Sequence, residues 1–188
     1  MLEKKLFTLA CVLAILGIGA CFQAPPRPPA VPLPPALAGA RVLAIDVRDA
    51  SPSDPLPSAK LSDFTAAEFN AHWNLRHVRV VSAGSSASPD ATLHITILNK
   101  QATPGHTLGQ SQSWKVILAT RMQLVGKDGR QIWLRDESPI TITTWRSPAT
   151  PFSWQYGSLL YDVALHLAWR AGTAFHKSNA VQSPPEHP

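Results

Sequence analysis

The sequence predicts an α+β domain with two helices packed on one face of a mixed, mostly antiparallel sheet, in the order β-α-β-β-β-β-α. Three observations predict this fold. Short β-branched or alternating segments recur between residues 41 and 145, as is typical of strands. Two longer segments repeat apolar residues every three or four positions, as is typical of helices. The chain is 45% hydrophobic and contains six tryptophans, so it can build a packed core.

The first half of the domain predicts a strand, a helix and a second strand. Residues 41–47, RVLAIDV, are apolar and β-branched and predict the first strand. A proline-containing loop follows, and residues 60–75 then predict a helix with Ser58 or Ser62 as its N-cap. Residues 77–82 predict the second strand. The apolar stripe expected for the helix consists of Leu61, Phe64, Ala67 or Glu68, Ala71 and Leu75.

The middle of the chain predicts a long hairpin. Residues 91–102 and 114–125 alternate apolar and polar side chains, which predicts two half-buried strands. Pro104 to Gly109 is expected to end the first of them. The turn Gly126-Lys-Asp-Gly129 then leads into a return strand that begins at Arg130 and continues to residue 145 across a bulge at Pro139.

The end of the chain predicts a closing helix and a tail. Residues 158–176 have helical spacing, and residues 178–188 are polar, contain proline and are expected to be disordered. The predicted domain therefore spans residues 41–177. The apolar stripe of the closing helix consists of Leu159, Leu160, Val163, Leu167 and Ala171.

The N-terminus predicts an export signal and a lipid anchor. A short basic start is followed by an apolar run, residues 6–20, which spans roughly 22 Å as a helix, short of the roughly 30 Å hydrocarbon core. Ile18-Gly-Ala-Cys21 resembles the lipobox of bacterial lipoproteins, which implies cleavage after residue 20 and lipidation of Cys21. The alternatives are a transmembrane helix and a plain signal peptide with an incidental cysteine. The absence of aspartate after Cys21 implies, by the same resemblance, sorting to the outer membrane.

Residues 21–40 predict a linker between this anchor and the domain. Seven prolines between Pro25 and Pro35 favour an extended conformation with few backbone donors, so we expect the segment not to join a sheet. Fully extended, it would reach roughly 50 Å. A role as a PxxP ligand is the alternative interpretation.

The sequence contains no persuasive catalytic grouping, metal-ligand spacing or cofactor motif, so we expect a protein that is not an enzyme and has no cofactor or metal. The net charge of +5 is a mild basic excess without a nucleic-acid-binding motif, and no nucleic-acid partner is expected. The hairpin carries Lys115, Arg121, Lys127 and Arg130, which are candidates for a patch that contacts lipid phosphates. The alternative is a solvated strand face whose charges discourage aggregation.

Four segments follow the lipobox in order: residues 89–98 (PDATLHITIL), 114–125, 127–130 and 131–134. Together they resemble the LptE-like family of lipopolysaccharide-assembly lipoproteins. The resemblance implies a lipid-anchored protein on the periplasmic face of the outer membrane, which assists lipopolysaccharide insertion with a β-barrel partner and contacts lipopolysaccharide through basic residues. The hairpin cations named above are then the candidates. The alternative is a stalked periplasmic scaffold that binds peptidoglycan or another envelope complex.

Overall fold

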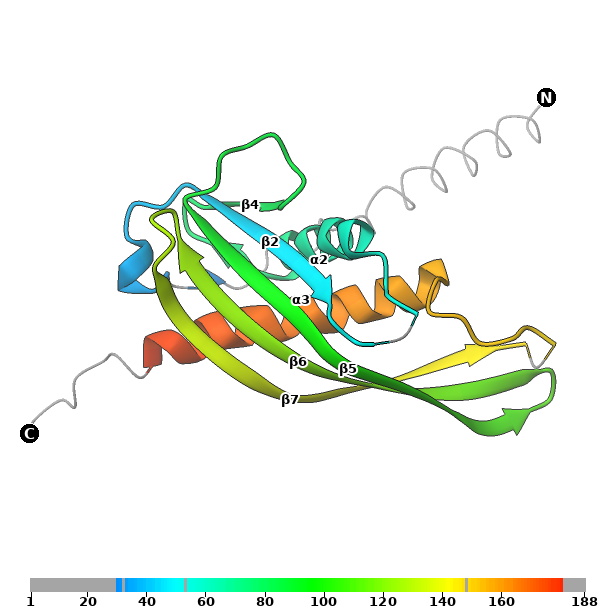
Figure 1. Cartoon of the computed structure of the whole chain (residues 1–188). Coiled ribbons are helices and arrows are strands. Elements are labelled where there is room, and N and C mark those ends of the chain that lie inside the picture. The colour runs from blue at the N-terminus through cyan, green and yellow to red at the C-terminus, as the bar shows by residue number, and fades with distance from the viewer. Residues whose placement is uncertain (1–29, 32, 53, 148, 181–188) are drawn as a thin grey trace, which may run out of the picture.

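The predicted fold class is confirmed. A computed structural model describes residues 30–31, 33–52, 54–147 and 149–180. It contains a five-stranded sheet and two α-helices, and Figure 1 shows the helices packed behind the sheet. The spatial order of the strands is β4-β2-β5-β6-β7. The strands are β2 (Val42–Asp49), β4 (Arg79–Ser82), β5 (Ala91–Leu108), β6 (Ser111–Gly126) and β7 (Gln131–Arg146), and the helices are α2 (Ser58–His72) and α3 (Gly157–Ala180).

The sheet combines a parallel half with an antiparallel half. β2 lies between β4 and β5 and runs parallel to both, with Leu43 opposite Val80 and Ala91. The parallel β2–β4 pair needs a crossover, which α2 provides. The strands β5, β6 and β7 form an antiparallel meander. All strands therefore start or turn at one common end of the sheet, marked by Val42, Arg79 and Gly126.

The core lies between the sheet and the two helices. Every second residue of β5 from Ala91 to Ile97 is buried, and β6 repeats the pattern from Val116 to Leu124. The five residues predicted as the stripe of α3 are all buried, which confirms that prediction. Complete burial of one such aliphatic side chain contributes roughly 1.5–3 kcal/mol, so this layer dominates the stability of the domain.

The predicted stripe of α2 is partly wrong. Ala67 and Ala71 are exposed, and Leu75 lies beyond the helix in the short strand β3 (Asn74–Leu75). The residues that the helix buries are Leu61, Ser62, Thr65, Ala66, Glu68 and Phe69. This face includes hydroxyl groups because the helix packs closely on β2: the Ser62 hydroxyl accepts a hydrogen bond from the Val47 N–H at 2.9 Å.

The predicted serine caps of α2 are also not formed. The N-cap position is Pro57, and no side chain caps the helix there. Ser58 is the first helical residue, and the Ser62 hydroxyl donates to its carbonyl oxygen at 2.9 Å instead of capping.

The far part of the meander extends beyond the helices as a three-stranded arm, consisting of residues 99–108, 111–119 and 140–146 (Figure 1). The expected end of the strand at Pro104 is wrong, because β5 continues to Leu108 through a shift of register between Pro104 and Thr107. The predicted bulge at Pro139 is confirmed: Ile140 pairs with Leu118, but Glu137 pairs with Thr120.

Part of the predicted linker is packed on the domain. We call residues 30–31 and 33–40 the strap. Its strand β1 (Ala30–Val31) pairs in parallel with β3, so the prediction that this segment joins no sheet is wrong there. Val31 and Leu37 are 1% and 4% exposed, and a short 3-10 helix, η2 (Pro35–Leu37), turns the strap toward β2. Ala30 and Val31 are not prolines and keep the backbone N–H that pairing requires.

The remaining boundaries differ little from those predicted. α3 continues to Ala180, so residues 178–180 of the predicted tail are helical. The predicted signal peptide, residues 1–20, lies outside the described residues, as do Cys21 and residues 181–188.

Candidate interaction surfaces

The structure does not bring the four predicted cations together. Lys115 is exposed on the arm, opposite Thr103 and Thr143. Lys127 and Arg130 lie at the β6–β7 turn, twelve residues further along β6, which at about 3.3 Å per residue is roughly 40 Å away. The hairpin therefore contains no single patch that all four residues share.

Arg121 lies between these two sites and is occupied by a carboxylate. Its Nε and Nη2 donate to Asp136 Oδ1 and Oδ2 at 2.6 and 3.1 Å across the β6–β7 pair. The hydrogen bond raises the pKa of Arg121 and lowers the pKa of Asp136. Lys115 and Arg121 do share the open face of the sheet, as predicted, but the charge of Arg121 is neutralised there.

A second set of charges on the open face is also neutralised locally. Asp46 Oδ2 lies 2.7 Å from Arg48 Nη2 and 2.9 Å from His94 Nδ1. Across the described residues, no group of histidine, cysteine, aspartate and glutamate has the arrangement of a metal site. The open face is therefore a surface of internally paired polar groups.

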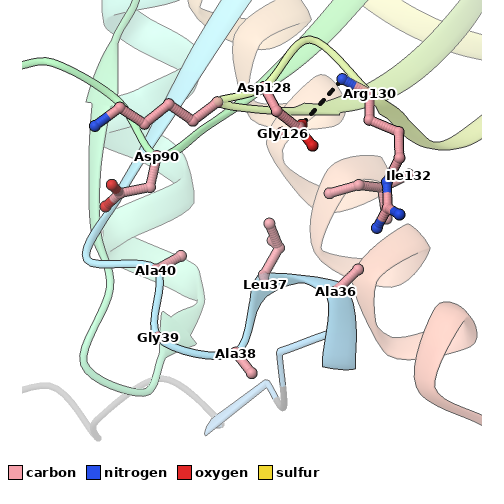
Figure 2. Close-up of a pocket in the computed structure, with 11 residues that line it drawn as sticks. Ala36, Leu37, Ala38, Gly39, Ala40, Asp90, Gly126, Asp128, Arg130 and Ile132 are labelled. Carbon is pink, nitrogen blue, oxygen red and sulfur yellow. Dashed lines mark hydrogen bonds between the residues drawn. The ribbon is translucent and has the colours of Figure 1, made fainter.

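The common end of the sheet carries cations without such partners. We call it the basic end and define it by Arg41, Arg76, Arg79, Lys127 and Arg130. All five side chains are exposed, and none forms a salt bridge to a carboxylate of the described residues. Lys127 and Arg130 line a pocket of about 330 Å³ together with residues 36–40 of the strap. Figure 2 shows Arg130 on one side of this pocket and residues 36–40 on the other. Arg41 and Arg76 line an adjacent pocket of about 440 Å³ with His77 and Leu33.

Two carboxylates lie at the basic end, and both are used by the backbone. Asp90 Oδ2 accepts hydrogen bonds from the backbone N–H groups of Arg41 and Val42 at 2.8 and 3.0 Å. These bonds, with the positive charges of Lys127 and Arg41, lower the pKa of Asp90. Asp128 accepts from the backbone N–H of Arg130 at 3.0 Å, as the dashed line in Figure 2 shows. The five cations thus outnumber the two carboxylates, and the basic end keeps an excess of positive charge that an external anion can meet.

The tip of the arm has the opposite character. Residues 101–114 contain no lysine, arginine, aspartate or glutamate. Leu108 is 74% exposed at the tip, and Trp145 is 49% exposed on the neighbouring strand. Residues 101–114 at the tip therefore offer a segment without these charged residues, near two large exposed apolar side chains, which sequence analysis did not identify because it expected β5 to end before Leu108.

A buried ion pair at the base of the arm was also missed. Lys100 Nζ lies 2.8 Å from Asp49 Oδ2, and the two side chains are 2% and 0% exposed. The Lys100 ammonium also lies 5.4 Å from the ring centre of Trp154. Asp49 accepts further hydrogen bonds from the backbone N–H groups of Ser51 and Leu56 at 2.9 and 2.8 Å. Burial raises the pKa of Asp49, but these bonds and the ammonium outweigh it and leave that pKa below its usual value.

The described residues contain no helix long and apolar enough to cross a membrane.

His166, which the sequence places four residues after Asp162 on α3, bonds to the backbone oxygen of Asp162 at 2.8 Å through Nδ1. That contact is a local helix contact rather than an acid–base couple.

Comparison with known proteins gives distant structural matches alone. No protein-family model and no curated protein matches the chain. A PelC dodecamer from Paraburkholderia phytofirmans is similar at 14% identity and a TM-score of 0.40, over 72% of this chain and 86% of that one. A putative lipoprotein from Caulobacter crescentus CB15 matches at 10% identity and a TM-score of 0.41, over 74% and 93%. Lipoprotein GNA1162 from Neisseria meningitidis matches at 12% identity and a TM-score of 0.32, over 70% of this chain and 97% of that one.

These matches include bacterial lipoproteins, but their low identities and TM-scores assign no function to this chain. None of the three is described as a lipopolysaccharide-assembly protein. The resemblance to that family therefore stays a prediction.

Proposed function

We propose that this chain is a non-enzymatic lipoprotein, anchored through Cys21 on the periplasmic face of the outer membrane, which assists lipopolysaccharide assembly together with a β-barrel partner. The packing of the strap carries this proposal. The scaffold alternative depended on a stalk of about twenty residues, but packing of the chain begins at Ala30. Nine residue steps separate Cys21 from Ala30, which cannot exceed about 32 Å. A domain held this close to the membrane suits work on a membrane partner.

The surfaces described above support the proposal in a second way. The described residues present a cluster of exposed cations at one end of the sheet and two large exposed apolar side chains at the other, which suits a protein that holds two different neighbours. Leu108 and Trp145 are the side chains that a protein partner would cover at the arm tip.

An affinity pull-down from detergent-solubilised envelope, followed by mass spectrometry, tests the proposal. We expect the tagged, processed protein to recover a large outer-membrane barrel in stoichiometric amount. The intact mass of the recovered bait should show acylation. Recovery of peptidoglycan-associated proteins without a barrel would contradict the proposal and support the scaffold alternative.

A further inference from the structure

We propose that the basic end is a docking surface for anionic phospholipid head groups of the leaflet that holds the lipid anchor. This inference rests on the anchor of the proposed function and adds an orientation: the basic end faces the membrane, and the arm points away from it. The surface consists of Arg41, Arg76, Arg79, Lys127 and Arg130, on the loops where the strands start or turn.

The first argument is the path of the chain. The strap enters the domain at Ala30, which pairs with Asn74, two residues before Arg76. Residues 36–41 then line both pockets of the basic end. A tether of at most about 32 Å from Cys21 to Ala30 therefore keeps these cations within reach of the head groups.

The second argument is the distribution of charge. Elsewhere on the open face of the sheet, Arg48 and Arg121 are paired with Asp46 and Asp136. At the basic end, five exposed cations outnumber the two carboxylates, Asp90 and Asp128, so this end keeps an excess of positive charge. On the arm, residues 101–114 contain no lysine, arginine, aspartate or glutamate, and its cations outside the buried Lys100–Asp49 pair are Lys115 and Arg146. Positive charge is thus densest at the basic end, and an anionic surface attracts that end most strongly.

The third argument concerns the source of the phosphate groups. Arginine binds phosphate with a planar pair of donors, and four of the five cations are arginines. Lipopolysaccharide carries phosphates as well, but the anchor of the proposed function holds the domain against the phospholipids of its own leaflet at high local concentration, which favours many weak contacts with them.

Energy transfer between the lipidated full-length protein and acceptor-labelled vesicles tests this orientation. A donor is attached to a cysteine introduced at Ala38, on the strap, or at Gln110, at the arm tip; both positions are exposed. The sixteen residues of β6 separate the two ends by roughly 50 Å. On vesicles with phosphatidylglycerol, we expect transfer from position 38 to exceed transfer from position 110 severalfold. On phosphatidylcholine alone, that ratio should fall by at least half.

A matched pair of charge variants makes the test specific. Lys127→Gln/Arg130→Gln should lower the ratio on phosphatidylglycerol vesicles about twofold or more. Lys60→Gln/Lys115→Gln removes the same charge from exposed side chains elsewhere and should leave it unchanged. Equal energy transfer from positions 38 and 110 would overturn the inference. So would a transfer ratio that is the same on phosphatidylglycerol and phosphatidylcholine vesicles, or the same in Lys127→Gln/Arg130→Gln as in the native sequence.

Failure of the anchor is distinguishable from failure of the surface. If the purified protein has the mass of an unacylated chain, the proposed lipoprotein function fails. The same protein added to preformed vesicles then still reports on the surface: flotation with phosphatidylglycerol vesicles that is lost in Lys127→Gln/Arg130→Gln supports it. Equal flotation of both forms contradicts it.

Discussion

At the scale of single residues, the Lys100–Asp49 pair shows how a buried charge is held. Both side chains lie beneath the loops that follow β2 and β7, and Asp49 is surrounded by donors. Such a pair gives little net stability over an apolar pair, but removal of one partner leaves an uncompensated buried charge. Loss of one partner is therefore expected to cost more stability than replacement of both partners by uncharged residues.

We expect Lys100→Met to lower the free energy of unfolding by about 3–5 kcal/mol, because the Asp49 carboxylate loses its counter-ion. The double variant Asp49→Asn/Lys100→Met should recover part of that loss. Chemical denaturation of the three proteins measures both effects. The exposed pair of Arg121 provides the control: Arg121→Met should change stability little. A loss from Lys100→Met no larger than that from Arg121→Met would show that the pair is not buried in solution.

The lowered pKa of Asp49 predicts acid sensitivity. Because the folded pKa lies below the ordinary value of 3.8, the carboxylate contributes its full stabilisation well above that pH. The contribution is lost as the pH falls through the folded pKa. Denaturation curves at a series of acidic pH values should show a steeper loss for the native sequence than for Asp49→Asn/Lys100→Met. Parallel curves would refute the assignment.

Lys100 also shows where reasoning from sequence fails at this scale. Alternation from Leu93 to Ile97 places even-numbered residues of β5 on the open face, and Lys100 would follow them. The structure inserts one extra residue, Leu98, between the pairs Ile97–Thr120 and Asn99–Ala119. This bulge reverses the alternation and turns Lys100 inward. No composition signal in the segment marks a bulge, so the buried pair was not predictable.

At the scale of elements, the contact between α2 and α3 depends on a missing side chain. A Cβ atom at Gly172 would lie 2.1 Å from Trp73 Cε2, so the glycine makes room for the indole that follows α2. Trp73 also packs edge-to-face on Trp169, with ring centres 5.1 Å apart. Both helices thus meet at an indole that tolerates no added bulk on α3.

Gly172→Ala should therefore destabilise the protein by about 1–3 kcal/mol, even though alanine is the better helix former. Thermal unfolding measures this. Gly157→Ala is a matched control, since an added Cβ at the start of α3 meets nothing within 4 Å, and we expect no loss there. A stabilising Gly172→Ala would mean that the indole moves freely.

The strap predicts a second effect at this scale. Leu37→Ala removes a side chain that is 4% exposed and should cost about 2–5 kcal/mol, with faster proteolysis between residues 30 and 40. Ala38→Ser, at the exposed neighbouring position, is the control. Equal proteolysis of both variants would contradict the docking of the strap.

Elements with strong periodicity were predictable, and those set by tertiary contacts were not. The stripe of α3 was correct because its buried residues are apolar and recur every three or four positions, whereas α2 buries Ser62 and Thr65, which carry no apolar signal. The strap was mistaken for a spacer because its prolines dominate the composition, while its packing depends on Val31 and Leu37. Of the four candidate cations, Lys127 and Arg130 do lie together, because one tight turn holds both.

At the scale of the whole molecule, the arm extends beyond the helices and places two exposed apolar side chains far from the core. The tip is not covered by either helix in Figure 1. Leu108→Ser/Trp145→Ser should leave thermal stability nearly unchanged, because both side chains are exposed, and reduce barrel recovery in the pull-down severalfold. Gln110→Ser at the same tip is the control. If Leu108→Ser/Trp145→Ser and Gln110→Ser both recover as much barrel as the native sequence, the partner binds elsewhere on the domain.

The strap has a consequence for a domain under mechanical load. β1 is a strand of only two residues that pairs with β3, whereas the strands of the five-stranded sheet pair over long registers. A force applied through residue 29 therefore peels the strap before it opens the sheet, because the weakest local contacts yield first. Release of the strap up to Arg41 would lengthen the tether between Cys21 and the folded domain by eleven residue steps, roughly 40 Å. Under load, we therefore expect the strap to detach and lengthen the tether while the five-stranded sheet and its helices stay folded.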